Sequence, residues 1–189
     1  MRFLTGLLLA LLLAACGKPP VQVQEAFVFG TRVEVLVADA DVAKAKAATA
    51  TVLREFDRLH RTYHAWQPSE LTALNAAIAS GKTHPVTPEL AGFIVDAQAV
   101  ATAGERLFDP GIGELVRLWG FHSEEFRAVL PDPAALAAWR AATPSILDLR
   151  VEDGRVSSAR RAVALDFGGY LKGVALDHAA AALRDAGVQ

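Results

Sequence analysis

Two adjacent glycines and a lysine follow a strand-like segment in the stretch LDFGGYLKGVALD, residues 165–177. Glycine lets a ligand approach the backbone closely, and the free N–H groups at a helix start attract phosphate. Lys172 can reach phosphate oxygens, and Asp166 can bind a ribose hydroxyl or a metal ion. The stretch matches neither the P-loop nor the dinucleotide fingerprint. By themselves, these residues favour a solvated lysine after a common turn over a phosphate site.

A second group of polar residues lies in TYHAWQPSELTALN, residues 62–75. Tyr63 ends an apolar helical stripe, so periodicity alone favours a core aromatic. Asn75 is polar among apolar neighbours, which indicates a hydrogen bond to a loop or a place in a ligand site. His60 and His64 are four residues apart, but no third metal ligand follows them. We expect two solvated histidines near a helix end.

A third stretch, FDPGIGELVRLWGF, combines turn residues with a short apolar segment. Asp109 begins a turn, and its structural alternative to a ligand role is to cap the helix that follows. Gly113 permits close approach of another backbone segment or of a ligand.

The N-terminus has the pattern of a bacterial lipoprotein signal. A short apolar run ends in LAAC, which predicts a signal peptide over residues 1–15, a lipidated Cys16, and a linker through residue 26. An ordinary cleaved signal or an uncleaved helix is the alternative. Cys16 is the only cysteine, so internal disulfides and cysteine-ligated metal sites are excluded. We expect a lipid-anchored protein on the periplasmic side of a bacterial membrane.

The remaining pattern mixes strands and helices without a regular βαβ repeat, which predicts an α+β fold. The formal net charge is −2 with interspersed signs, so nucleic-acid binding has little support. The expected elements are a strand over residues 27–37, an amphipathic helix ending near Tyr63, helices capped by Ser69 and by Thr87 with Pro88, two short helices after Gly113 and Pro131, a hairpin turned by Asp153-Gly154, and a last helix ending at Gly187.

Four segments in this order, FGT and the three stretches above, resemble the FAD:protein FMN transferases, the ApbE-like family. The resemblance runs from Phe27 to the last residue and implies the N-terminal portion of the ApbE-like fold over residues 27–189. It implies Mg²⁺-dependent transfer of FMN from FAD to a Ser or Thr hydroxyl of a target flavoprotein, with release of AMP. Typical targets are subunits of membrane redox complexes of the Nqr and Rnf type. Some family members instead hydrolyse FAD to FMN and AMP.

The resemblance also implies site residues. The main-chain carbonyl of Gly169 would ligate Mg²⁺, beside bulkier neighbours, Tyr170 and Leu171, than the family usually has. Phe29 stands where a Met is usual. The implied FAD-binding residues are Tyr63, Ser69, Glu70, Leu71, Asn75, Asp109, Gly113, Asp166, Gly168, Lys172 and Asp177.

The Asp and Thr that complete the family's Mg²⁺ site would lie beyond residue 189, so we expect no catalytic residue within the chain. We expect the chain alone to be inactive as a transferase and poorly stable, unless another polypeptide supplies the rest. The alternatives are a non-catalytic FAD-binding lipoprotein and an inactive truncated fragment.

Overall fold

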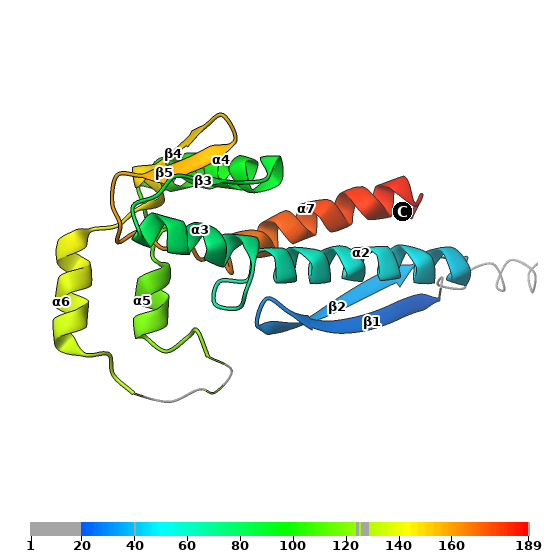
Figure 1. The fold of residues 1–189 in the computed structure, drawn as a ribbon. Helices are drawn as coiled ribbons and strands as arrows, with labels where there is room; N and C mark the ends of the chain where they lie inside the picture. The colour runs from blue at the N-terminus through cyan, green and yellow to red at the C-terminus, as the bar shows by residue number, and fades with distance from the viewer. Residues whose placement is uncertain (1–19, 40, 124, 126–128, 189) are drawn as a thin grey trace, which may run out of the picture.

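The computed structural model describes residues 20–39, 41–123, 125 and 129–188. Helices and antiparallel strands are mixed along the chain (Figure 1), which confirms the predicted α+β class. The predicted signal peptide and Cys16 lie outside the described residues. Within those residues, every helix is too short or too polar to cross a membrane.

A β-hairpin opens the described chain. Strands β1 (Val21–Val28) and β2 (Thr31–Ala38) pair in antiparallel fashion, from Val21 opposite Ala38 to Val28 opposite Thr31. Phe29 and Gly30 connect them with φ angles of 54° and 68°, the left-handed pair that a tight hairpin turn requires. The single strand over residues 27–37 and the linker over residues 21–26 are therefore wrong predictions. The glycine turns the chain back, and VQVQ alternates because it is the partner strand.

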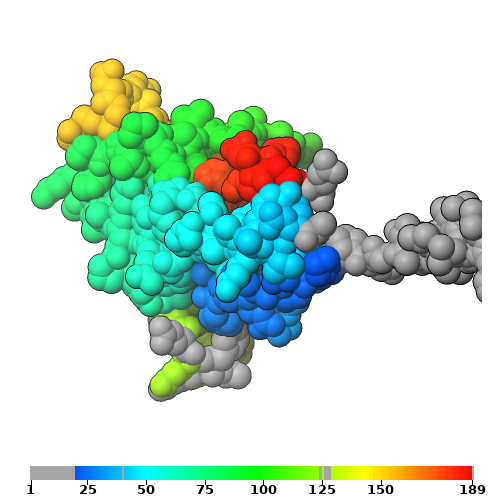
Figure 2. All heavy atoms as spheres, turned by 90° about the vertical axis from the view of Figure 1, so that its right-hand side faces the viewer, coloured from blue at the N-terminus to red at the C-terminus, as the bar shows by residue number. Residues whose placement is uncertain are grey.

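Three long helices form the frame of the molecule. Helix α2 (Val42–Thr62) packs against the hairpin and also against the last helix, α7 (Tyr170–Asp185). Figure 2 shows α7 lying against α2 at the surface. Helix α4 (Pro88–Ala103) begins at the cap Thr87 and ends at Gly104, as predicted.

Shorter elements complete the fold. Helix α3 (Glu70–Ala79) begins at Ser69, whose side chain accepts the N–H of Thr72 in a capping box, as predicted. A small sheet has the order β3-β5-β4, and Asp153-Gly154 turns its hairpin, also as predicted. The remaining bounds are β3 His84–Pro85, β4 Leu149–Glu152, β5 Arg155–Ser158, the adjacent helices α5 Gly113–Leu118 and α6 Pro133–Ala142, and a 3₁₀ turn, η1, Ile146–Asp148.

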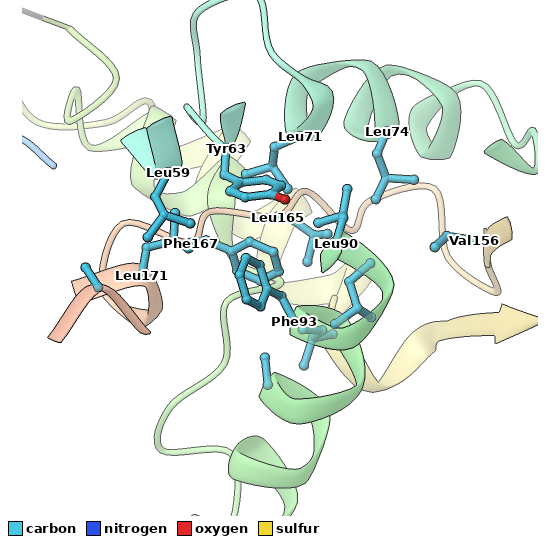
Figure 3. Close-up of a cluster of buried hydrophobic side chains, with 14 of the residues drawn as sticks. Leu59, Tyr63, Leu71, Leu74, Leu90, Phe93, Val156, Leu165, Phe167 and Leu171 are labelled. Atoms are coloured by element: carbon cyan, nitrogen blue, oxygen red, sulfur yellow. The ribbon is translucent and has the colours of Figure 1, made fainter. Parts of the chain in front are cut away.

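The core lies where α2, α3, α4 and the segment before α7 meet (Figure 3). Leu165 and Phe167 are fully buried there, on either side of Asp166. Full burial of a large apolar side chain contributes about 1.5–3 kcal/mol. The turn that carries Asp166, Gly168 and Gly169 is therefore anchored by its apolar neighbours. Other members of the cluster are Leu59, Tyr63, Leu71, Leu74, Leu90, Phe93, Val156 and Leu171.

Candidate functional site

A small cavity of about 50 Å³ opens between the β1–β2 turn, the end of α2 and the start of α7. It brings together three of the residues predicted to bind FAD, Tyr63, Asp166 and Gly168, although they are far apart in the sequence. The complete lining is Phe29, Gly30, His60, Tyr63, His64, Ala65, Trp66, Asp166, Gly168 and Leu171.

Asp166 is the only carboxylate among these lining residues, and both of its oxygens have a partner. Oδ1 accepts the Gly168 N–H at 2.8 Å, and Oδ2 lies 2.8 Å from His122 Nε2. Burial opposes ionisation of Asp166, but the hydrogen bonds from His122 and Gly168 outweigh burial and lower its pKa below the ordinary value. The cavity wall therefore carries a fixed negative charge at neutral pH.

A group of stacked rings forms one side of the cavity. The His122 ring stacks on Trp66 with centroids 4.9 Å apart and planes 22° apart, and His64 meets Trp66 edge-on at 4.4 Å. His60 lies 4.9 Å from His64, and burial lowers the pKa of His60. Trp66, His64 and His60 line the cavity and make its wall largely aromatic, and His122 packs against Trp66 from behind this lining.

The prediction of two solvated histidines is wrong for His64, which is only 8% exposed. The chain folds back after α2, so the backbone N–H of Gln67 donates to His64 Nδ1 at 3.2 Å. His122 was missed altogether. Its only local signal is a polar ring directly after the apolar segment WGF, and its partner Asp166 is 44 residues away.

Tyr63 belongs to the core and to the cavity together. It is 2% exposed, and its ring meets Phe93 edge-on with centroids 5.2 Å apart. Its hydroxyl donates to Glu89 at 2.5 Å, and burial raises the pKa of Tyr63 further above its ordinary value. Figure 3 shows the ring among buried side chains. The preference for a core aromatic is confirmed, and flavin contact by Tyr63, which also lines the cavity, stays a prediction.

The predicted residues at the start of α3 bind the protein's own backbone. Ser69 caps α3, and Glu70 accepts the backbone N–H of Thr87 at 2.8 Å, which joins α3 to the start of α4. Leu71 is fully buried in the core. A flavin role for these three residues remains a prediction, and their present contacts are structural.

Asn75 links α3 to the segment before α7. Its Nδ2 donates to the carbonyl of Leu165 at 2.9 Å, and its Oδ1 accepts the N–H of Leu165 at 2.7 Å. Because Leu165 is buried, the amide supplies both of its backbone hydrogen bonds where water cannot. Of the two alternatives for Asn75, the hydrogen bond to a loop is confirmed.

Asp109 and Gly113 join the segment before α5 to the segments that precede η1 and α7. Asp109 Oδ1 accepts the N–H groups of Gly111 and Ile146, both at 2.9 Å, and Oδ2 accepts the Ser145 hydroxyl at 2.5 Å. Gly113 donates its N–H to the Ala164 carbonyl at 2.7 Å, and a Cβ at Gly113 would lie 2.8 Å from that oxygen. Gly113 thus permits the close approach expected of it, to backbone rather than to a ligand.

Lys172 and Asp177 differ from the residues above. Both side chains are exposed on α7, and neither forms a hydrogen bond or an ion pair with the part of the chain that the structure describes. Gly169 is the N-cap of α7, and no side chain caps that end of the helix. The start of α7 therefore offers a helix end without a side-chain cap and an exposed cation, Lys172.

The described residues do not form a Mg²⁺ site by themselves. They contain no group of three or more His, Cys, Asp or Glu side chains that could hold a metal ion. The Gly169 carbonyl is an oxygen donor of the right chemistry, but Mg²⁺ demands six ligands in near-octahedral geometry. One carbonyl fits such a site only as a part of it.

Comparison with known proteins identifies the class to which this fold and site belong. The ApbE family model matches residues 29–189, so the chain belongs to the ApbE family. It is 40% identical over 194 residues to the FAD:protein FMN transferase of Rhodobacter capsulatus, covering 99% of this chain and 37% of that relative. The chain therefore spans well under half of the length of this relative.

Solved structures confirm the expected ApbE-like fold. The ApbE protein of Thermotoga maritima matches with a TM-score of 0.78 at 22% identity, over 88% of this chain and 53% of that one. The flavin transferase ApbE of Vibrio cholerae matches with a TM-score of 0.75 at 23% identity, over 89% and 55%. The described fold corresponds to about half of each of these proteins.

Proposed function

We propose that this chain forms the N-terminal part of an FAD:protein FMN transferase, which transfers FMN from FAD to a Ser or Thr hydroxyl of a target flavoprotein and releases AMP. Membership of the ApbE family and 40% identity to a protein of that name support the class of reaction. The observation that carries the proposal is the Asp166–Gly168–Gly169 turn, which lies between an aromatic cavity and the uncapped start of α7.

The chemistry of this turn suits the two halves of FAD. The N–H groups and the dipole at the start of a 16-residue helix favour an anion, and Lys172 can add its charge to a pyrophosphate. The aromatic cavity favours a flavin ring. Pockets that enclose drug-sized ligands hold about 300–1,000 Å³. At about 50 Å³, the cavity can take only an edge of the ring system.

Mg²⁺ is the cofactor that we propose for this reaction. The Gly169 carbonyl would be one of its ligands, and the others would come from outside the residues that the structure describes. A bound Mg²⁺ neutralises charge that develops on a pyrophosphate during phosphoryl transfer. This chain would contribute Lys172 and the start of α7, which would bind the oxygens of the same pyrophosphate.

The sequence pattern at Cys16 supports a further proposal about location. A lipid on Cys16 would hold the protein on the periplasmic side of a bacterial membrane. The targets that we propose are subunits of membrane redox complexes of the Nqr and Rnf type, which would present a Ser or Thr to the site.

The test measures AMP release from FAD in the presence of Mg²⁺ and of a purified target subunit of an Nqr-type complex, whose Ser or Thr hydroxyl accepts the FMN. One sample contains the full chain, and a second also contains the C-terminal part of the Rhodobacter capsulatus relative, expressed separately. We expect FAD binding by the full chain and AMP release only in the second sample. FAD binding without AMP release in either sample would favour the alternative, a non-catalytic FAD-binding protein. A folded chain that binds no FAD would contradict both functions.

A further inference from the structure

Three loops meet at one histidine, His122, which contacts two residues of the cavity lining, Trp66 and Asp166. His122 comes from the segment after α5, Trp66 from the loop after α2, and Asp166 from the turn before α7. The His122 ring stacks on the indole at 4.9 Å and contacts the carboxylate through Nε2 at 2.8 Å. The side chain of His122 is 10% exposed and that of Asp166 is 13% exposed. The contact is therefore largely shielded from water.

We propose that His122 is a positioning residue for the flavin site. It fixes the carboxylate of Asp166 and the indole of Trp66 at the rim of the cavity, and it acts on the ligand through these two groups. This inference rests on the proposed function, because FAD is the ligand whose binding the two groups would affect.

The hydrogen bonds of Asp166 explain why its orientation depends on His122. Oδ1 is held by the Gly168 N–H, and Oδ2 is held by His122. Without His122 the carboxylate is held at one oxygen only and can rotate about that contact. The same carboxylate holds Gly168, which precedes the N-cap Gly169, so a loose carboxylate also loosens the start of α7.

Other charged groups lie near the His122–Asp166 contact, but His122 forms its hydrogen bond with Asp166. Glu114 on α5 interacts electrostatically with His122, and His64 does so with Asp166. Glu114 is itself held by Arg117, whose guanidinium donates to both of its oxygens. Among these groups, Asp166 is the acceptor that His122 reaches with a hydrogen bond.

Three substitutions separate the two contacts of His122. His122→Phe keeps a ring for Trp66 and removes the hydrogen bond, His122→Gln keeps a donor and removes the ring, and His122→Ala removes both. The matched control is His178→Ala. His178 also pairs with a carboxylate, Glu55, at 2.7 Å, but Glu55 does not line the cavity, whereas Asp166 and Trp66, the partners of His122, do.

The first measurement is FAD affinity of the full chain by fluorescence quenching. We expect His122→Ala to weaken binding about tenfold, which corresponds to about 1.4 kcal/mol. His122→Phe and His122→Gln should lie between this value and the wild type, and His178→Ala should bind as the wild type does. Circular dichroism identifies any variant that fails to fold. Unchanged or tighter binding by folded His122→Ala would overturn the proposal.

A second measurement does not depend on FAD. The tryptophan emission that Trp66→Phe removes is assigned to Trp66. We expect this emission to move to longer wavelength in His122→Ala, because one indole face becomes exposed to water, and to stay in place in His122→Phe. If the wild type binds no FAD, the proposed function fails, while this emission still tests the positioning. An emission that is the same in His122→Ala and the wild type would overturn the positioning role.

Discussion

Helix α3 and the turn before α7 both carry polar residues of the family motifs, but they use them differently. At α3, Ser69, Glu70 and Asn75 bind backbone groups of the protein itself. At the turn, Asp166 faces the cavity, and Lys172 lies exposed on the first turn of α7. A polar residue of a family motif can therefore stabilise the protein backbone around the site or be available to bind a ligand. The sequence pattern does not distinguish these two roles.

The physical reason for the difference is burial. Leu165 is buried, so its backbone groups need protein partners, and Asn75 of α3 supplies them. The start of α7 lies at the surface, where water or a ligand can satisfy its N–H groups. The comparison predicts that α3 substitutions reduce stability, whereas α7 substitutions reduce ligand binding.

The largest effect is expected at α3. Asn75→Ala leaves the N–H and the carbonyl of buried Leu165 without partners, which costs about 3 kcal/mol in the free energy of unfolding. Urea unfolding followed by circular dichroism measures this loss. The control is Ser80→Ala, an exposed position near the end of the same helix, where we expect a change within about 0.5 kcal/mol. Equal stability of the two variants would show that the Asn75 bridge is not structural.

The next effect concerns the close approach of Gly113 to the backbone of Ala164. Gly113→Ala places a Cβ about 2.8 Å from the Ala164 carbonyl, so the two backbone segments must move apart. We expect a loss of about 2 kcal/mol in unfolding free energy, typical of an overpacked interior. Gly173→Ala is the control, because no atom lies within 4 Å of a Cβ there. A Gly113→Ala protein as stable as Gly173→Ala would contradict the close approach.

At the start of α7 the comparison predicts the opposite pattern. Lys172→Ala removes an exposed charge without an ion pair among the described residues, so unfolding free energy should change by less than about 0.5 kcal/mol. FAD affinity should fall about tenfold, or about 1.4 kcal/mol. The matched control is Lys82→Ala, an exposed lysine after α3. If both lysine variants bind FAD equally well, Lys172 does not contact the pyrophosphate.

The smallest effect is a pH dependence outside the site. Hydrogen bonds from Arg58, despite partial burial, lower the pKa of Glu89 below its ordinary value. The stability from this group is therefore present above the ordinary pKa and is lost as pH falls through the lowered one. Glu89→Gln should make the loss of stability below about pH 4.5 shallower, by under about 1 kcal/mol because the pair is partly exposed. Urea unfolding at a series of pH values measures this difference. If the unfolding free energies of the wild type and Glu89→Gln fall equally below about pH 4.5, the Arg58–Glu89 pair does not contribute.

Local signals made part of the fold predictable. The caps Ser69 and Thr87 and the turn at Asp153-Gly154 lie beside the elements that they begin or connect, so their chemistry is visible in a few residues. The hairpin at Phe29-Gly30 was missed because its two strands continue one alternating pattern. Only the pairing of β1 with β2 shows that the chain reverses there.

The site was less predictable, because its contacts join distant residues. The glycine turn with Lys172 was visible in the sequence, and the family resemblance predicted that it binds FAD. The bond between Asn75 and Leu165 spans 90 residues, and the bond between His122 and Asp166 spans 44. Such contacts depend on how helices pack, and no local pattern determines them.

The central claim is that the turn before α7 is a formed part of a flavin site. The most direct test titrates the full chain with FAD, with and without Mg²⁺, beside Lys172→Ala and the folded control Lys82→Ala. The account predicts micromolar binding by the wild type and by Lys82→Ala, and weaker binding by Lys172→Ala. A folded wild-type chain that binds no FAD would contradict it.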